Sequence, residues 1–172
     1  KKKMANEIYD STWWGNTIDT ASSIGTSTEM IQGQFNLTKL GDELVTNGDF
    51  ATNSDWNKSS FWTISNGVAL MSETSSYLPL FQNDVTVPNV KYKLTFDIIS
   101  ITGSIKATSL NNGATAGEIT LGVYSTVGTK EVSFTTQTQC RAVSFARVVG
   151  IPSSCSIDNV SVKEVRATTV EA

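Results

Sequence analysis

The sequence predicts an all-β protein, a jelly-roll β-sandwich with an extended N-terminal arm. Apolar and polar residues alternate over several short segments, most clearly from Tyr92 to Ile98, and this period of two residues indicates strands. Turn-forming pairs such as Asn66-Gly67 separate the segments. The 172 residues also include 23 Thr and 21 Ser, a composition that suits strands and turns.

The strands expected in the folded module follow one another with turn signals between most of them. In order they are Glu43–Phe50, Phe61–Ser65, Val68–Ser72, Tyr77–Val85, Lys91–Ile101, Gly103–Ser109, Gly117–Tyr124, Thr129–Thr135, Cys140–Val148 and Ser156–Val165. Many short strands with regularly spaced turns are typical of sandwiches and barrels. We expect a jelly roll of two sheets.

Three parts are expected along the chain: an extended docking arm over 1–42, a jelly-roll module over 43–166 and a frayed tail over 167–172. No helical or strict strand period persists before residue 42. The arm holds Tyr9 and the adjacent Trp13 and Trp14, and two exposed tryptophans are costly to leave in water. They either pack on the module's own surface or fill a pocket on another subunit, and we predict docking to a partner because Trp is enriched at binding hot spots.

Composition excludes several classes of function. The formal net charge of −3 argues against a nucleic-acid partner. The chain has no histidine, which removes the usual general base and most zinc sites. No apolar stretch approaches the roughly 20 residues that cross a bilayer. Cys140 and Cys155 are expected to be two free, buried thiols.

Catalysis is not expected either. The candidate carboxylates are scattered, and no two have the spacing of an acid–base pair; they are Asp42, Glu43, Asp49, Asp55, Glu73, Asp84, Asp97, Glu118, Glu131 and Asp158. No phosphate-binding loop, metal-ligand cluster or nucleophile elbow is present in the sequence. We therefore predict that the protein is not an enzyme.

Two phrases bracket the module. The first runs from Leu44 through Asn47-Gly48 to Phe50 and is followed by Trp56; the second is the segment 156–165. The pair resembles the opening and closing strands of carbohydrate-binding modules of the family 4/9/22 type. It resembles even more closely the divergent copies of that jelly roll in bacteriophage virion proteins, such as head fibres, capsid decoration proteins and tail fibres. The resemblance implies that the first and last strands lie together.

The same resemblance implies a structural calcium ion where these strands meet, with Asp49 and Asp158 as the matching ligands. Calcium takes oxygen ligands, including carboxylates. The sequence departs from the family at Ala51 and Asn159, where a carboxylate is common. The alternative is that Asp158 and Asn159 cap a turn through side-chain-to-backbone hydrogen bonds.

Glycan binding would need aromatic rings for stacking and polar groups for the sugar hydroxyls. Tyr77, Gln82 and Tyr124 are the expected glycan-binding residues. Core packing accounts better for the other large aromatic residues considered, which are Trp56, Trp62 and Phe81. Arg141, Arg147 and Lys106 either recognise an acidic glycan or subunit or belong to a solvated sheet face.

These inferences point to a bacteriophage virion protein that is made in the host cytoplasm and displayed on the particle surface. The arm would anchor it to a capsid or tail protein, the module would contact host surface glycans, and repetition around the particle favours a homo-oligomer. One alternative is a secreted bacterial carbohydrate-binding module of a glycoside hydrolase, for which a Pro- or Gly-rich linker is expected in place of paired tryptophans. The other is a purely structural module that cements the capsid.

Overall fold

The computed structural model describes residues 34–74, 79–111 and 114–171, and within these ranges the chain consists of strands, turns and loops without a helix. None of the described residues therefore forms a helix that could span a membrane. Tyr9, Trp13, Trp14 and Tyr77 lie outside the described residues. The all-β fold expected from the sequence is confirmed.

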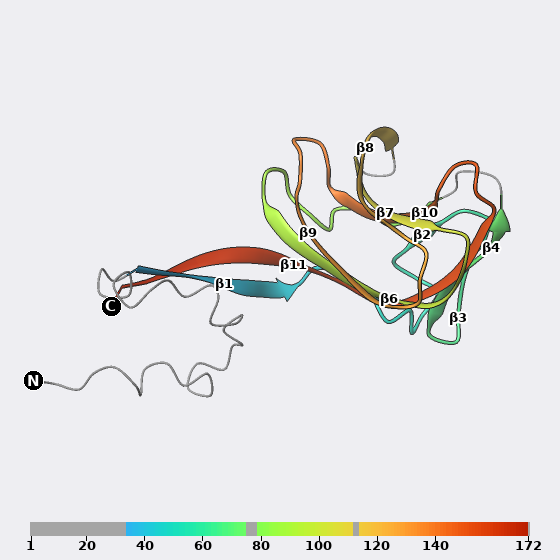
Figure 1. Ribbon diagram of the computed structural model, residues 1–172, viewed down its shortest axis with the longest axis horizontal. Helices are drawn as coiled ribbons and strands as arrows, with labels where there is room; N and C mark the ends of the chain where they lie inside the picture. Colours follow the sequence, from blue (N-terminus) through green and yellow to red (C-terminus); the bar gives the residue numbers. More distant parts are fainter. Residues whose placement is uncertain (1–33, 75–78, 112–113, 172) are drawn as a thin grey trace, which may run out of the picture. The chain divides into compact units, whose positions relative to one another are not determined.

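Two antiparallel sheets form the sandwich (Figure 1). The six-stranded sheet has the order β3 (Trp62–Ser65), β4 (Val68–Thr74), β11 (Ser153–Glu171), β6 (Lys91–Thr102) and β9 (Gly128–Thr135), with β1 (Gln34–Glu43) also paired to β11. The five-stranded sheet has the order β2 (Asn57–Lys58), β5 (Leu80–Gln82), β10 (Ala142–Arg147), β7 (Ile105–Asn111) and β8 (Ala114–Tyr124). This two-sheet arrangement confirms the predicted jelly roll.

The chain divides into two compact units. The larger unit is 40–165 and contains the whole core; the described part of the smaller unit is 34–39 with 166–171. Residues 167–171 were expected to fray, but β11 continues to Glu171. The strand β1 was not anticipated, because apolar alternation in that segment is too brief to indicate a strand and its partner lies more than a hundred residues away.

Alternating side chains of both sheets fill the core. On β6 the buried residues are Tyr92, Leu94, Phe96 and Ile98, while the residues between them are more exposed. The Phe96 ring lies 4.8 Å from that of Phe145 on the opposite sheet, in an edge-to-face arrangement that aromatic pairs prefer. The sandwich is therefore closed by aromatic contacts between its two sheets.

Trp56 and Trp62 belong to this core, as predicted from the sequence. The Trp56 ring lies 5.3 Å from that of Phe50, and its Nε1 donates to the carbonyl of Asn47 at 3.0 Å. Cys140 and Cys155 are free and buried, which confirms the prediction of two buried thiols.

The opening and closing phrases lie side by side, as the resemblance implied. The N–H of Leu44 donates to the carbonyl of Val162 at 3.0 Å, and the N–H of Val160 donates to that of Gly48 at 2.8 Å. A strand over 43–50 was wrong, however, since β1 ends at Glu43. Asn47 and Phe50 have φ values of 53° and 49°, which extended backbone cannot accommodate.

Candidate functional site

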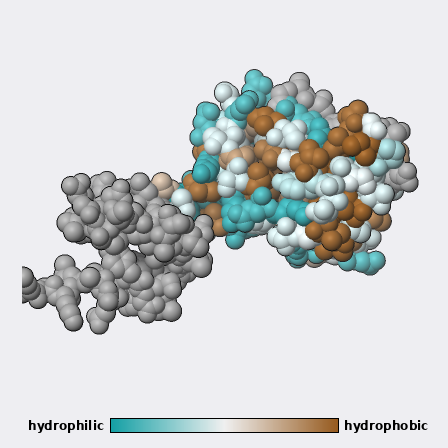
Figure 2. Space-filling model, viewed as in Figure 1, coloured by the Kyte–Doolittle hydropathy of each residue, from teal (hydrophilic) through white to brown (hydrophobic). Residues whose placement is uncertain are grey.

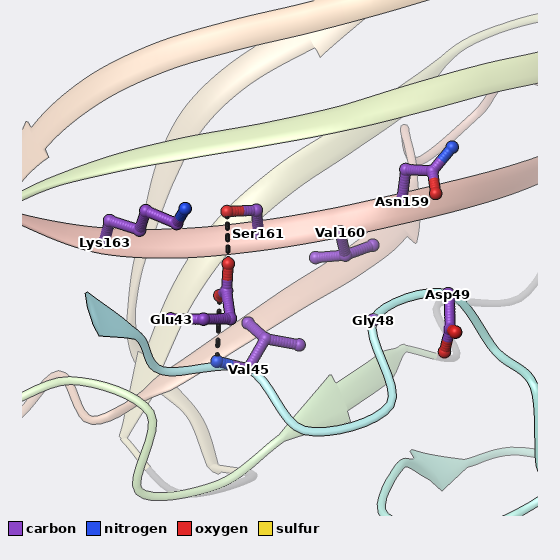
Figure 3. A pocket seen from close by; sticks show the side chains of 8 residues that line it. All are labelled: Glu43, Val45, Gly48, Asp49, Asn159, Val160, Ser161 and Lys163. Carbon is purple, nitrogen blue, oxygen red and sulfur yellow. Dashed lines mark hydrogen bonds between the residues drawn. The ribbon is translucent and has the colours of Figure 1, made fainter. Parts of the chain in front are cut away.

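A shallow pocket lies where the first and last strands of the module meet (Figure 3). It has a volume of about 380 Å³ and is lined by Glu43, Val45, Gly48, Asp49, Asn159, Val160, Ser161 and Lys163. The opening and closing phrases supply all of these residues except Glu43, which directly precedes the opening phrase. Gly48 allows the close approach of the two segments, because a Cβ there would lie 2.0 Å from the carbonyl oxygen of Val160.

Glu43 bonds the two segments together. Its Oε1 accepts the N–H groups of Val162 at 2.8 Å and of Leu44 and Val45 at 3.1 Å each. Its Oε2 accepts the Ser161 hydroxyl at 2.5 Å. Both carboxylate oxygens are thus engaged by donors of the protein itself. Only the position of Glu43 next to the opening phrase could have indicated this role from the sequence.

The described residues do not fit the calcium ion that the resemblance implied. Asp49 lines the pocket, but its carboxylate points away from β11 (Figure 3) and its Oδ1 accepts the N–H of Ala51 at 3.3 Å. Asp158 is not part of the pocket lining, and its Oδ1 accepts the N–H of Asn159 at 2.7 Å. Over 34–74, 79–111 and 114–171 no three His, Cys, Asp or Glu residues form a group that could hold a metal ion. The alternative of side-chain-to-backbone caps agrees with this geometry at Asp158 alone, since the Asn159 amide donates to the Asp97 carboxylate at 2.9 Å.

Gln82, expected to contact a glycan, is directed into the protein. It is 7% exposed. Its Oε1 accepts the N–H of Thr46 at 2.9 Å, and its Nε2 donates to the carbonyls of Thr46 at 2.8 Å and Asp55 at 3.2 Å. The amide therefore holds the segment before β2 against β5 and is not presented to a ligand.

Tyr124, the second of the expected glycan residues, is half-buried at the end of edge strand β8. Its ring packs edge-on against Phe96 at 5.2 Å, and burial raises the pKa of its hydroxyl. The ring faces the interior and packs against the core, so it is not presented for stacking on a sugar. Tyr77, the third, lies outside the described residues.

The three basic residues do not form one patch. Arg147 is buried, and its Nη1 donates to the carbonyls of Val148 at 3.0 Å and Ile151 at 3.4 Å. Arg141 is exposed and precedes β10. Lys106 bonds to Glu118, with both side chains largely buried. Arg147 therefore does not belong to a solvated sheet face, because its side chain turns inward and bonds to the following loop.

The outer face of the five-stranded sheet is the second candidate site. The β7–β10 register pairs Leu110 with Ala142, Thr108 with Ser144 and Lys106 with Ala146. Since the neighbouring positions Ala107, Val143 and Phe145 belong to the core between the sheets, these three pairs face the other way. We call these six residues the outer-face strip. Five of them are at most 1% exposed although they face away from the core.

Two hydroxyls in this strip have no partner. Thr108 Oγ1 and Ser144 Oγ are buried without a hydrogen bond, and they belong to directly opposed residues. Buried polar groups are nearly always paired, so each exception calls for an explanation. The ion pair of Lys106 and Glu118 lies beside them on the same face, so the strip combines polar groups with small side chains.

Phe81 adds an aromatic ring to this face. It pairs with Ser144 in the β5–β10 register, between the inward residues Leu80 and Gln82. It is half-buried and, unlike Leu80, not part of the core between the sheets. The sequence prediction that Phe81 is a core residue was therefore wrong. The sequence carries no signal of this, because two apolar residues, Leu80 and Phe81, stand next to each other and the polar Gln82 is the one that faces inward.

Exposed apolar residues gather at one end of the sandwich. The strand pairs Ile98–Gly128, Ile105–Tyr124 and Ile105–Arg147 lie near this end, so the loops that adjoin these strands lie at the same end of the sandwich. Its large apolar residues with at least 40% exposure are Ile99, Val123, Val127, Val149 and Ile151. Figure 2 shows apolar patches among polar ones on the described surface. Such a concentration suits contact with another protein.

No protein-family model matches the sequence, and no curated protein matches it either. Solved structures do match. A variant of a family 29 carbohydrate-binding module is 13% identical, covers 76% of this chain and 92% of its own, and has a TM-score of 0.53. A second variant complexed with cellulohexaose is 13% identical over 74% and 91%, with a TM-score of 0.54. A third complexed with mannohexaose is 14% identical over 76% and 92%, with a TM-score of 0.52. The chain therefore has the fold of a carbohydrate-binding module.

Proposed function

We propose that the protein is a non-enzymatic glycan-binding subunit of a bacteriophage particle. The observation that carries the glycan-binding part is the outer face of the five-stranded sheet, where an aromatic ring lies beside two unpartnered buried hydroxyls. The fold supports the same function, since similar solved structures are complexed with cellulohexaose and mannohexaose.

The chemistry of this face suits an oligosaccharide. Phe81 offers a flat apolar ring for a sugar face, and the Thr108 and Ser144 hydroxyls are free to bond sugar hydroxyls. Both hydroxyls are buried in the free protein, so glycan binding here requires a local opening of this face. Lys106 and Glu118 lie beside Thr108 and Ser144 on the same face and supply charged partners for the sugar.

The virion part of the proposal rests on the resemblance of the opening and closing phrases and on the arm. Trp13, Trp14 and Tyr9 would dock on a capsid or tail protein, so that the module stands on the particle surface after synthesis in the host cytoplasm. The exposed apolar end of the sandwich supports contact with a neighbouring copy.

The alternative is a secreted bacterial carbohydrate-binding module of a glycoside hydrolase, which the fold and its solved likenesses support equally well. A purely structural cement module is the third reading. A glycan-binding measurement separates the cement module from the two glycan-binding hypotheses. A particle-attachment measurement separates the virion subunit from the secreted module.

Glycan binding is tested by array screening followed by calorimetry of the Phe81→Ala variant. We expect the variant to bind at least about tenfold more weakly, because truncating a central aromatic contact costs at least about 1.4 kcal/mol. Phe61→Ala is the matched control, since Phe61 is also half-buried and outside the core but precedes β3 on the other sheet. Equal affinity of both variants would remove the outer face from consideration.

Attachment is tested with particles that lack the protein. The arm proposal predicts that Trp13→Ala combined with Trp14→Ala abolishes attachment while the module keeps its melting temperature. Limited proteolysis should cleave within residues 4–33, before the paired strand β1, rapidly in the free protein and slowly on the particle. Undiminished attachment of the double variant would favour the secreted module.

A further inference from the structure

We infer that the Glu43 carboxylate closes the jelly roll between its first and last strands without a metal ion. We call Glu43 and its four donors, which belong to Leu44, Val45, Ser161 and Val162, the Glu43 clasp. The inference concerns the junction pocket and is independent of the glycan-binding proposal.

The clasp joins segments that are distant in the chain. Glu43 is the last residue of β1, while its partners on β11 follow it by 118 and 119 residues. Hydrogen bonds to a carboxylate are roughly twice as strong as those between neutral groups. A single ionised side chain thus ties the start of the module to its end.

The clasp also leaves no carboxylate oxygen of Glu43 free to coordinate a cation. A calcium ion requires free oxygen ligands at about 2.3–2.6 Å. Both oxygens of Glu43 already accept bonds from N–H and O–H groups, and a cation that took the carboxylate would have to break these bonds. Lys163, on the same pocket wall, adds a positive charge that disfavours a second cation.

The remaining acidic residues do not compensate. Asp49 and Asp158 each bond to a backbone N–H of their own segment, and their side chains do not converge on the clasp. The carboxylate and its four donors therefore hold the two neighbouring segments in register, as a bound cation would.

The first experiment measures thermal unfolding of the full chain in EDTA and in millimolar calcium. We expect the two midpoints to agree within about 1 °C, whereas a site filled at 100 times its Kd would raise the midpoint by about 5 °C or more. A calcium-dependent rise of that size would overturn the inference, whatever the outcome of the glycan measurements.

The second experiment compares Glu43→Ala with Asp49→Ala and with Glu131→Ala. We expect Glu43→Ala to lower the midpoint by about 3–6 °C, because several bonds are lost although the side chain is exposed to water. The two controls should change it by less than about 2 °C, because Asp49 accepts one local bond and Glu131 forms an exposed ion pair with Lys93. A Glu43→Ala midpoint equal to those of the controls would overturn the inference.

Glu43→Gln is a milder variant that still tests the inference if Glu43→Ala fails to fold. It keeps the length of the side chain and one carbonyl acceptor but removes the charge, so its midpoint should lie between those of the wild type and Glu43→Ala. Hydrogen exchange should be faster at the amides of Val45 and Val162 than in the wild type, with amides of the distant β7 unchanged. Wild-type exchange rates at both amides would contradict an ionised clasp.

Discussion

At the scale of single residues, the junction of the module depends on side chains that do almost no apolar packing. Gly48 lets two backbones touch, Asn47 turns the chain at positive φ, and its side chain bonds to Thr52 and to the carbonyl of Ser54. Gly48 and Asn47 were both expected in a strand over 43–50, so the turn at Asn47 was missed. Their partners on β11 were not visible in the sequence, because contacts between distant segments leave no local pattern.

Gly48→Ala should destabilise the protein by about 3 kcal/mol, since the added Cβ would lie 2.0 Å from the backbone oxygen of Val160 and the segments must separate. Chemical denaturation measures the change. Gly128→Ala is the comparison: its Cβ meets nothing within 4 Å, but φ is 98°, so only about 1–2 kcal/mol of backbone strain is expected. Equal losses at the two positions would refute the close contact.

Cys155 gives the module a dependence on alkaline pH. Burial raises the pKa of its thiol from 9.0 to about 12, so above pH 9 the unfolded chain loses a proton that the folded chain keeps. Stability should therefore fall as the pH rises from about 9 to about 12. Denaturant midpoints at pH 8 and pH 11 check this, and Cys155→Ala should show a smaller decrease than the wild type.

At the scale of elements, strand positions were predicted well and strand faces less well. The β6 alternation predicted both the strand and its buried face. For β10, by contrast, all six residues are buried, so no alternation exists that separates core from outer face. The clustering of Phe81, Thr108 and Ser144 depends on which strands pair, and pairing between β5, β10 and β7 cannot be deduced from one strand's pattern.

The outer-face strip should be more stable without its unpartnered hydroxyls. Ser144→Ala and Thr108→Val each remove a buried oxygen that has no hydrogen bond, which should raise stability by about 1 kcal/mol. The same variants should weaken glycan binding, because the oxygens are then missing from the floor of the site. Calorimetric unfolding and binding measure both effects; a loss of stability in both variants would mean that the hydroxyls are already satisfied.

At the scale of the whole molecule, the core is confined to one of the two compact units. The buried apolar residues that pack between the sheets lie within 40–165. Length and composition were enough to predict a module with an appendage, but the limits of each unit depend on which residues contact one another in the folded chain. The described residues place that limit at Lys39 and Arg166.

A chain reduced to 40–165 should fold alone. It keeps every core residue and the complete Glu43 clasp, so its melting temperature should lie within about 3 °C of the full chain's. Near-UV circular dichroism tests whether the shortened chain has ordered packing, and a thermal scan gives its melting temperature. A molten chain without a cooperative transition would mean that 34–39 and 166–171 contribute to the core's stability.

The adjacency of the first and last strands has a mechanical consequence. As the chain advances from Leu44 to Gly48, its bonded partner retreats from Val162 to Val160, so the two ends of the larger unit leave it in the same direction. Force applied between these ends would load the bonds between β1 and β11 one after another until it reached the Glu43 clasp, and would unzip the junction at low tension. If the force acts instead between one end of the chain and a ligand bound to the sheet, the bonds between the opening and closing segments are not loaded in this way. A module with this geometry resists load when it is tethered by one end and yields when it is stretched between two.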